Sequence, residues 1–153
     1  MADDRTSKDT LPVWFAFFTE IGIINQLSRA LFEARLPDGV TVPHFTVLNH
    51  LMRVRDGQTP QRMAEAFQTP KASLTNTLAG LEARGLIEMR RNPDDGRSKQ
   101  VWLTETGRAF RDQAIGLLAQ DAAELAEQID LADMKTMLPL LENVRKVMDK
   151  ARD

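Results

Sequence analysis

The sequence contains no cysteine, which excludes disulfides, thiolate metal sites and cysteine-based redox switches. Histidine is also scarce: the sequence contains only His44 and His50. No acidic cluster accompanies them. Since positions six apart do not share a helix face, we expect structural roles for both and no bound metal or other cofactor. Hydrolase elbows of the Gly-x-Ser-x-Gly type and glycine-rich phosphate loops are absent too, so nothing in the sequence indicates an enzyme.

Long apolar runs and an excess of one charge are likewise missing. The densest apolar run, residues 13–18, is far shorter than the roughly 20 residues that span a bilayer. The polar first nine residues carry both signs and do not resemble a signal peptide, so we expect a cytoplasmic protein without a membrane partner. With 153 residues and a net charge of −2, the chain predicts one or at most two domains and excludes a uniformly basic nucleic-acid binder.

The charges are nevertheless unevenly distributed along the chain. Residues 53–99 hold nine basic and six acidic side chains and net +3, whereas the remainder nets −5. A basic middle between acidic flanks suits a face that binds a polyanion, although a solvated surface of mixed charge explains the pattern equally well. The basic residues of this stretch are Arg53, Arg55, Arg62, Lys71, Arg84, Arg90, Arg91, Arg97 and Lys99.

The first predicted element is a long helix that follows a disordered start over residues 1–9. Thr10 is expected to cap it, Pro12 falls in its first turn, and Pro37-Asp38-Gly39 ends it near residue 36. Its apolar positions cover more than one face, which a small domain has little room to enclose, so we expect a subunit interface. These positions are Trp14, Phe15, Phe17, Phe18, Ile21, Ile23, Ile24, Leu27, Leu31 and Phe32.

Three shorter helices are predicted next, each opened by a threonine with a nearby proline. Thr41 opens the first, Thr59 the second and Thr69 the third, and Gly85 ends the third as a C-terminal glycine. The link between the second and third helices is only a few residues long. Two helices joined so tightly are typical of a helix-turn-helix.

The apolar period then changes from 3.6 to 2. Alternation over residues 87–90 and 100–103, separated by the dense turn signal of residues 92–96, predicts a β-hairpin with a charged tip. Thr104 is expected to cap a fifth helix whose apolar side continues to Leu125. A sixth helix is expected to start at Asp130 or Asp133, with a proline at position 139 that kinks it or delays its start.

A helix-turn-helix followed by a hairpin is a winged helix, a fold whose shape and charge are suited to binding DNA. The second helix of the motif enters the major groove, and the wing places cations on phosphates or in the minor groove. Amide and hydroxyl side chains read base edges or bind phosphates. The candidate residues of this helix are Lys71, Ser73, Thr75, Asn76 and Thr77, and those of the wing are Arg90, Arg91, Arg97 and Lys99.

Residues 81–104 resemble the wing of the multiple-antibiotic-resistance regulator (MarR) family. The resemblance lies in Gly85-Leu86-Ile87, in Asp95-Gly96-Arg97 at the tip and in Leu103-Thr104 before a long helix. It extends to residues 42–80, and the order of helices fits nearly the whole chain. Family members often carry an Arg where this chain has Asn76 and a basic residue where it has Gly80, so this reading helix is less cationic than usual.

The resemblance implies a mainly α fold, a winged helix-turn-helix with a two-stranded wing and long N- and C-terminal dimerisation helices. The expected division is a disordered 1–9, a dimerisation helix at 10–40, the DNA-binding domain at 41–104 and dimerisation helices at 105–153. It further implies a homodimeric, sequence-specific regulator, expected to be a repressor, on a pseudo-palindromic double-stranded operator. In relatives the wing-tip arginine enters the minor groove and the aspartate two residues earlier orients it, a role that carries over to Arg97 and Asp95.

A small aromatic ligand is expected to release the protein from DNA, as in many relatives. The residues expected to wall its cavity are Trp14, Phe17, Phe18, His44 and Phe45, which otherwise simply fill the core. Gly80 costs about 1 kcal/mol in a helix interior, which predicts a close approach there. The alternative function is a winged-helix module that binds protein and not DNA, and the cationic wing argues against it.

Overall fold

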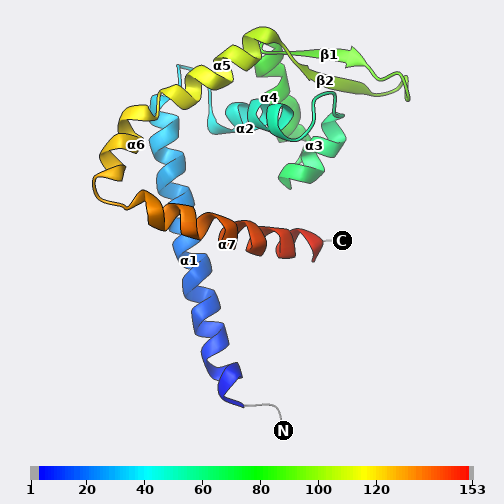
Figure 1. The fold of residues 1–153 in the computed structure, drawn as a ribbon. Helices are drawn as coiled ribbons and strands as arrows, with labels where there is room; N and C mark the ends of the chain where they lie inside the picture. The colour runs from blue at the N-terminus through cyan, green and yellow to red at the C-terminus, as the bar shows by residue number, and fades with distance from the viewer. Residues whose placement is uncertain (1–3, 152–153) are drawn as a thin grey trace. The chain divides into compact units, whose positions relative to one another are not determined.

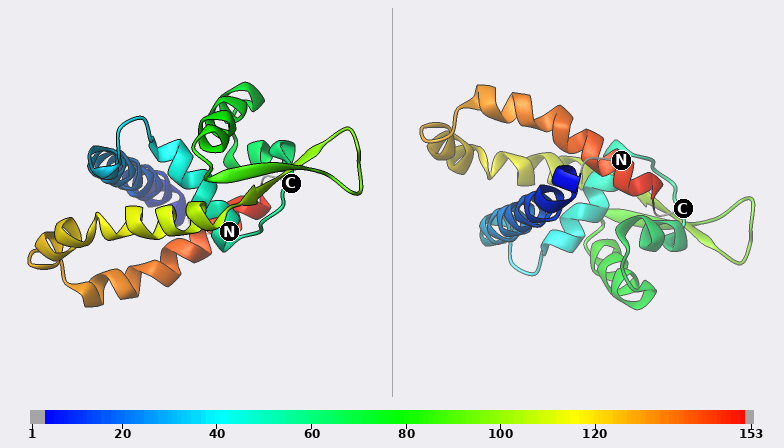
Figure 2. Two further views of the ribbon diagram at one scale, coloured as in Figure 1. Left: turned by 90° about the horizontal axis from the view of Figure 1, so that it is seen from above. Right: turned by 90° about the horizontal axis from the view of Figure 1, so that it is seen from below.

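The computed structural model describes the backbone of residues 4–151 and the side chains of residues 9–151. The chain forms two compact units, one ending at Ile115 and the other beginning at Gly116. As Figures 1 and 2 show, the fold is mainly α with one antiparallel two-stranded sheet, as expected. The elements are α1 (Asp4–Arg35), α2 (Val42–Arg53), α3 (Pro60–Phe67), α4 (Lys71–Ala83), β1 (Ile87–Arg91), β2 (Lys99–Leu103), α5 (Glu105–Gly116), α6 (Ala119–Ala126) and α7 (Leu131–Lys150).

Helix α1 begins earlier than the sequence indicated. It starts at Asp4, so residues 4–9 are helical where disorder was expected, and residues 1–3 lie outside the described residues. Thr10 is therefore not the cap and Pro12 lies inside the helix, at the cost of one backbone hydrogen bond. No glycine or proline interrupts residues 4–11, so nothing local stops the helix from extending toward the N-terminus.

The core of the first unit lies among α2, α3, α4 and the hairpin. Thr41 and Thr59 occupy the N-caps of α2 and α3 as predicted, and Thr59 Oγ1 accepts a hydrogen bond from the backbone N–H of Arg62 at 3.4 Å. Burial of large aliphatic side chains stabilises this core by about 1.5–3 kcal/mol each. The most buried are Val47, Leu48, Leu51, Met63, Leu81, Ile87 and Val101.

The turn between α3 and α4 holds a non-glycine residue in the left-handed region. Gln68 closes α3 with a φ of 50°, and its backbone N–H bonds to carbonyl oxygens of the last turn. Helix α4 starts at Lys71 with Pro70 as its N-cap, one residue later than the expected cap at Thr69. Gly85, predicted as the C-terminal glycine, follows α4 with a φ of 68°.

The hairpin forms in the predicted place. Strands β1 and β2 pair Ile87 with Leu103 and Arg91 with Lys99 at the two ends of the ladder. An isolated bridge between Gln58 and Val101 joins the α2–α3 loop to β2. The wing is therefore fixed at its base to the helix-turn-helix.

The helix expected to run to Leu125 is in fact two helices. Helix α5 is capped by Thr104, whose Oγ1 accepts from the N–H of Gly107 at 2.9 Å, and it ends at Gly116. Because glycine is a weak helix former, the helix stops there and α6 begins at Ala119.

Helix α7 begins after Asp130, whose Oδ1 accepts from the N–H of Ala132 at 2.8 Å, so this aspartate is the cap. Pro139 lies inside the helix and did not delay its start. None of the residues of α7 is buried within its unit. Within residues 4–151, no helix combines the length and the apolar character needed to cross a membrane.

Candidate nucleic-acid interface

Helix α4 buries one face and leaves a polar face free. Leu74, Leu78 and Leu81 are 3%, 4% and 0% exposed and point into the core. On the other side the side chains of Lys71, Ser73, Thr75 and Asn76 are exposed, and Thr77 is half-buried. The structure thus exposes the side chains of four of the five candidate residues of this helix.

Two of the hydroxyl groups on α4 are engaged with their own helix. Thr75 Oγ1 donates to the carbonyl oxygen of Lys71 at 2.9 Å, and Thr77 Oγ1 donates to that of Ser73 at 3.1 Å. Each of these threonine side chains therefore offers a partner only the lone pairs of its hydroxyl oxygen and its methyl group. The side chain of Asn76 makes no hydrogen bond within residues 9–151, so both its donor and its acceptor remain available for a base.

The four predicted cations of the wing are not equivalent. Arg90 forms an ion pair with Glu88, and its guanidinium lies 4.9 Å from the centre of the Trp102 ring, so it is partly neutralised and held against the sheet. The guanidinium of Arg91 folds back toward Gly96 of the turn. Arg97 and Lys99 are exposed and form no ion pair with any side chain that the structure describes.

Asp95 contacts Arg97 through the backbone. Its Oδ1 accepts a hydrogen bond from the backbone N–H of Arg97 at 3.0 Å, and it makes no ion pair with the guanidinium. The carboxylate therefore fixes the direction in which the main chain presents Arg97. This geometry differs from a direct pairing of the two side chains.

Asn92 organises the wing tip and was not singled out from the sequence. It is 9% exposed, its Oδ1 accepts from the N–H of Asp94 at 3.1 Å and from Gln100 Nε2 at 3.3 Å, and its Nδ2 donates to Ser98 Oγ at 2.8 Å. The bond to the second residue ahead is an Asx turn, for which the Asn-Pro dipeptide was an available signal.

Asp56 anchors the base of the wing and also escaped prediction. Its Oδ1 accepts from the N–H groups of Gly57 at 3.1 Å and Leu103 at 2.9 Å, and its Oδ2 accepts from Arg108 at 2.9 Å. The α2–α3 loop, the end of β2 and the start of α5 therefore meet on one carboxylate. Since its partners lie 47 and 52 residues away, no local pattern marks it.

The histidines have structural contacts. The Nδ1 atom of His44 accepts from the backbone N–H of Thr41 at 3.1 Å, while its Nε2 side faces Gly80. Burial and, next, the nearby charge of Arg84 lower the pKa of His44 from its usual 6.5. His50 lies 3.2 Å from Gln58 Oε1 and packs edge-on against Phe67. No group of three or more metal-binding side chains occurs in the described part of the chain.

The expected aromatic cavity is not formed within one chain. Trp14 and Phe17 contact Phe18 on α1 at ring distances of 5.1 and 5.3 Å, whereas Phe45 packs against Phe32 at 4.5 Å. Fourteen residues of helix place Phe18 about 21 Å from Phe32 along α1, so the two groups are separate. The reason is that the C-terminal part of α1, and not its aromatic N-terminal part, packs on α2.

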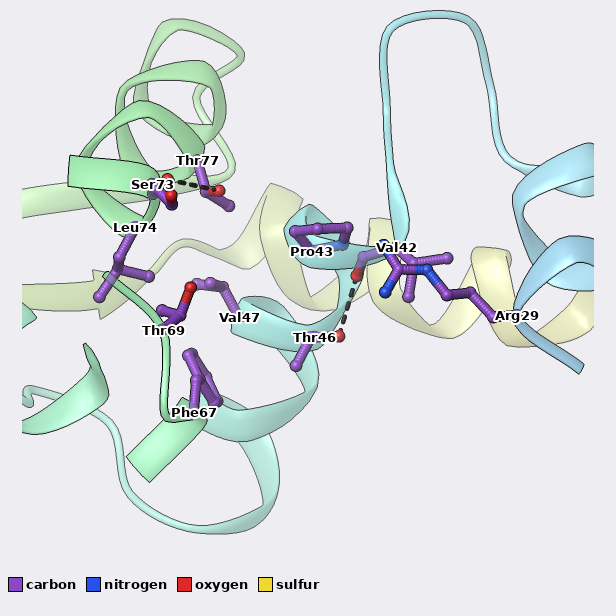
Figure 3. Close-up of a pocket in the computed structure, with 10 residues that line it drawn as sticks. All are labelled: Arg29, Val42, Pro43, Thr46, Val47, Phe67, Thr69, Ser73, Leu74 and Thr77. Atoms are coloured by element: carbon purple, nitrogen blue, oxygen red, sulfur yellow. Dashed lines mark hydrogen bonds between the residues drawn. The ribbon is translucent and has the colours of Figure 1, made fainter. Parts of the chain in front are cut away.

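A different cavity, of about 260 Å³, opens beside α4 (Figure 3). It combines one guanidinium with several hydroxyls and an apolar wall. Its lining residues are Arg29, Val42, Pro43, Thr46, Val47, Phe67, Thr69, Ser73, Leu74 and Thr77.

An exposed reading helix beside a cationic two-stranded wing defines a winged helix-turn-helix. A family model described as MarR family matches residues 38–98. Wild-type MarR from E. coli, in its apo form, is 29% identical with a TM-score of 0.71, over 82% of this chain and 94% of that one. A mutant MarR from E. coli complexed with operator DNA is 27% identical with a TM-score of 0.67, over 94% and 99% of the two chains.

The fold is also that of BpsR from Bordetella bronchiseptica, whose DNA binding is regulated by 6-hydroxynicotinic acid. That protein is 22% identical with a TM-score of 0.69, over 85% of this chain and 98% of that chain. Residues 38–98 thus match the MarR family, whose members are transcription factors and not enzymes, and the fold of the chain is that of MarR.

Proposed function

We propose that the chain is a homodimeric, sequence-specific regulator that binds a pseudo-palindromic operator and acts as a cytoplasmic repressor. One observation carries the DNA-binding part of the proposal. The polar face of α4 stays exposed because Leu74 and Leu78 hold its other face in the core, and the cationic wing follows directly. A protein-binding module has little use for an unpartnered Asn76 and two unpaired wing cations.

Selection from a random duplex pool tests this proposal. We expect enrichment of an inverted repeat, and binding at least a thousandfold tighter than to scrambled duplex. A chain with Lys71 and Arg97 both changed to alanine serves as the matched control and should enrich nothing. Equal affinity of the unaltered chain for all duplexes would contradict the proposal. Expression of a reporter behind the selected operator then separates repression from activation.

Dimerisation is supported by apolar surface on both terminal regions. On α1, Trp14 is 58% exposed and Leu27 65% exposed, and on α7, Leu138 is 57% exposed. Exposure of this extent is unusual on a monomer, and a second copy offers the matching surface. Sedimentation at micromolar concentration should give a dimer mass, which Leu138→Glu should lower toward 17.2 kDa. A monomer in the unaltered chain would refute the dimer.

A small aromatic carboxylate in the cavity beside α4 is proposed as the releasing ligand. Arg29 supplies a positive charge, Val42 and Phe67 an apolar wall, and Ser73 with Thr77 connects the cavity to the reading helix. Such a ligand weakens operator binding only to the extent that it binds the conformation without DNA more tightly than the conformation that binds DNA. A panel of aromatic carboxylates should weaken operator binding in the unaltered chain and fail to do so in Arg29→Gln. An equal response of both chains would exclude this cavity.

A further inference from the structure

A second, polar cavity of about 180 Å³ lies between the start of α3 and the wing. The α2–α3 loop contributes Arg55, α3 contributes Arg62, and the wing contributes Asn92, Asp94 and Gln100. Apart from Gly57, every lining residue has a polar or charged side chain. A cavity of this kind selects a charged or strongly hydrogen-bonding occupant.

The charge of this cavity favours an anion. Arg55 and Arg62 are exposed, and neither guanidinium forms an ion pair within residues 9–151. Asp94 is the only acid of the lining, and the first turn of α3 contains none, so the lining nets +1. Paired guanidinium groups match the planar, bidentate geometry of phosphate oxygens.

The wing side of the cavity is already built. Asn92 and Gln100 are joined by a hydrogen bond of 3.3 Å between Gln100 Nε2 and Asn92 Oδ1, and the isolated Gln58–Val101 bridge fixes the loop against the wing. The two arginines are therefore mounted on segments that are held together before any ligand arrives. An occupant would bridge the helix-turn-helix and the wing without moving either.

We propose that this cavity holds one phosphodiester of the bound duplex, a proposal that rests on the function proposed above. A reading helix in the major groove and a wing at the adjacent minor groove straddle the sugar-phosphate strand that separates the two grooves. A cavity between α3 and the wing faces that strand. A phosphodiester carries a single negative charge, which matches the net charge of the lining.

The contact is independent of sequence and supplies affinity and register. Backbone phosphates carry no base information, so Arg55 and Arg62 determine how tightly and in what position the duplex docks, whereas α4 determines which duplex is preferred. Asp94, the acid of the lining, repels the phosphate and so lowers the affinity that the two arginines provide.

Salt titration of duplex affinity tests this assignment. Arg55→Gln and Arg62→Gln should each lower the affinity for operator and for scrambled duplex by the same factor. Together they should reduce the slope of log K against log salt by about 0.9 for each half-site, because one phosphate contact is lost there. Arg53→Gln is the matched control, because it removes the same charge two residues away, at an exposed position outside the lining. It should leave the slope unchanged.

A variant that gains affinity distinguishes a change in the phosphate contact from misfolding of the chain. Asp94→Asn removes the opposing charge and should strengthen binding to both duplexes, an increase that misfolding does not produce. An unaltered slope in the Arg55→Gln, Arg62→Gln double variant would overturn the phosphate site while leaving the proposed function intact. A loss confined to the operator would also overturn it, because that result indicates base reading. Absence of any duplex preference in the unaltered chain would instead refute the proposed function.

Discussion

Gly80 of α4 lies directly against the imidazole of His44 on α2, and a Cβ at position 80 would stand 2.7 Å from Nε2. The ring has little freedom to withdraw, because Nδ1 accepts the N–H of Thr41 at 3.1 Å and lies 2.9 Å from its hydroxyl. The close approach expected at Gly80 is therefore confirmed, and its partner His44 completes the capping box that Thr41 begins at the start of α2.

Gly80→Ala should destabilise the chain despite the better helix propensity of alanine. Alanine gains about 1 kcal/mol in a helix interior, but it displaces His44 and so removes a cap interaction of about 1 kcal/mol besides straining the contact. In a His44→Ala background the clash is gone, and the same change should stabilise by up to about 1 kcal/mol. Urea unfolding of the four chains of this cycle measures the difference. Equal effects in both backgrounds would show that the contact is not the cause.

The lowered pKa of His44 makes stability depend on pH in a defined direction. Below 6.5, the usual value, the unfolded chain takes up a proton at this histidine while the folded chain still resists it. The contribution of His44 to the free energy of unfolding is therefore fully present above about pH 6.5. It falls as the pH decreases toward the lowered pKa of His44 in the folded chain. Denaturant unfolding from about pH 7.5 to about pH 5.5 should show a smaller loss in His44→Gln than in the unaltered chain. Parallel losses would assign the pH dependence to other groups.

Arg97→Ala should weaken binding to every duplex, most of all to those with A·T-rich flanks, because a minor-groove arginine reads groove width and potential. Asp95→Ala should weaken binding less, since it removes only the 3.0 Å bond that fixes the main chain at Arg97. Asp95→Asn keeps an acceptor oxygen and should bind nearly as the unaltered chain does. Titrations at one fixed salt concentration compare the three variants. Full affinity in Arg97→Ala would contradict the wing contact.

Asn76→Ala should change which sequence is preferred more than it changes affinity for random DNA. A bidentate contact to adenine supplies about 1–3 kcal/mol of discrimination, and the Asn76 amide is free to make it. Selection profiles of the two chains should differ at one position in each half-site. A uniform loss across all sequences would indicate that Asn76 contacts the backbone instead.

The elements that could be predicted are those encoded by neighbouring residues. Thr41 and Thr59 cap their helices, Gly85 adopts a positive φ after α4, and the turn signal at residues 92–96 joins two paired strands. Each signal acts over four or five residues, so the sequence is sufficient to place it. Predictions from local signals were wrong where the local preference for starting or ending a helix was weak. This was so at the start of α1 and at Gly116, where one expected helix is in fact two.

The sequence by itself determined the winged helix-turn-helix, the polar face of α4 and the cationic wing, because helix periodicity, capping and turn chemistry are local. Only the tertiary structure decided that Arg90 lies over the Trp102 ring, that Asp56 joins the loop to Leu103 and Arg108, and that the two cavities form where they do. The physical reason is that these arrangements depend on the directions in which separate elements present their side chains. Packing of the shared core sets those directions.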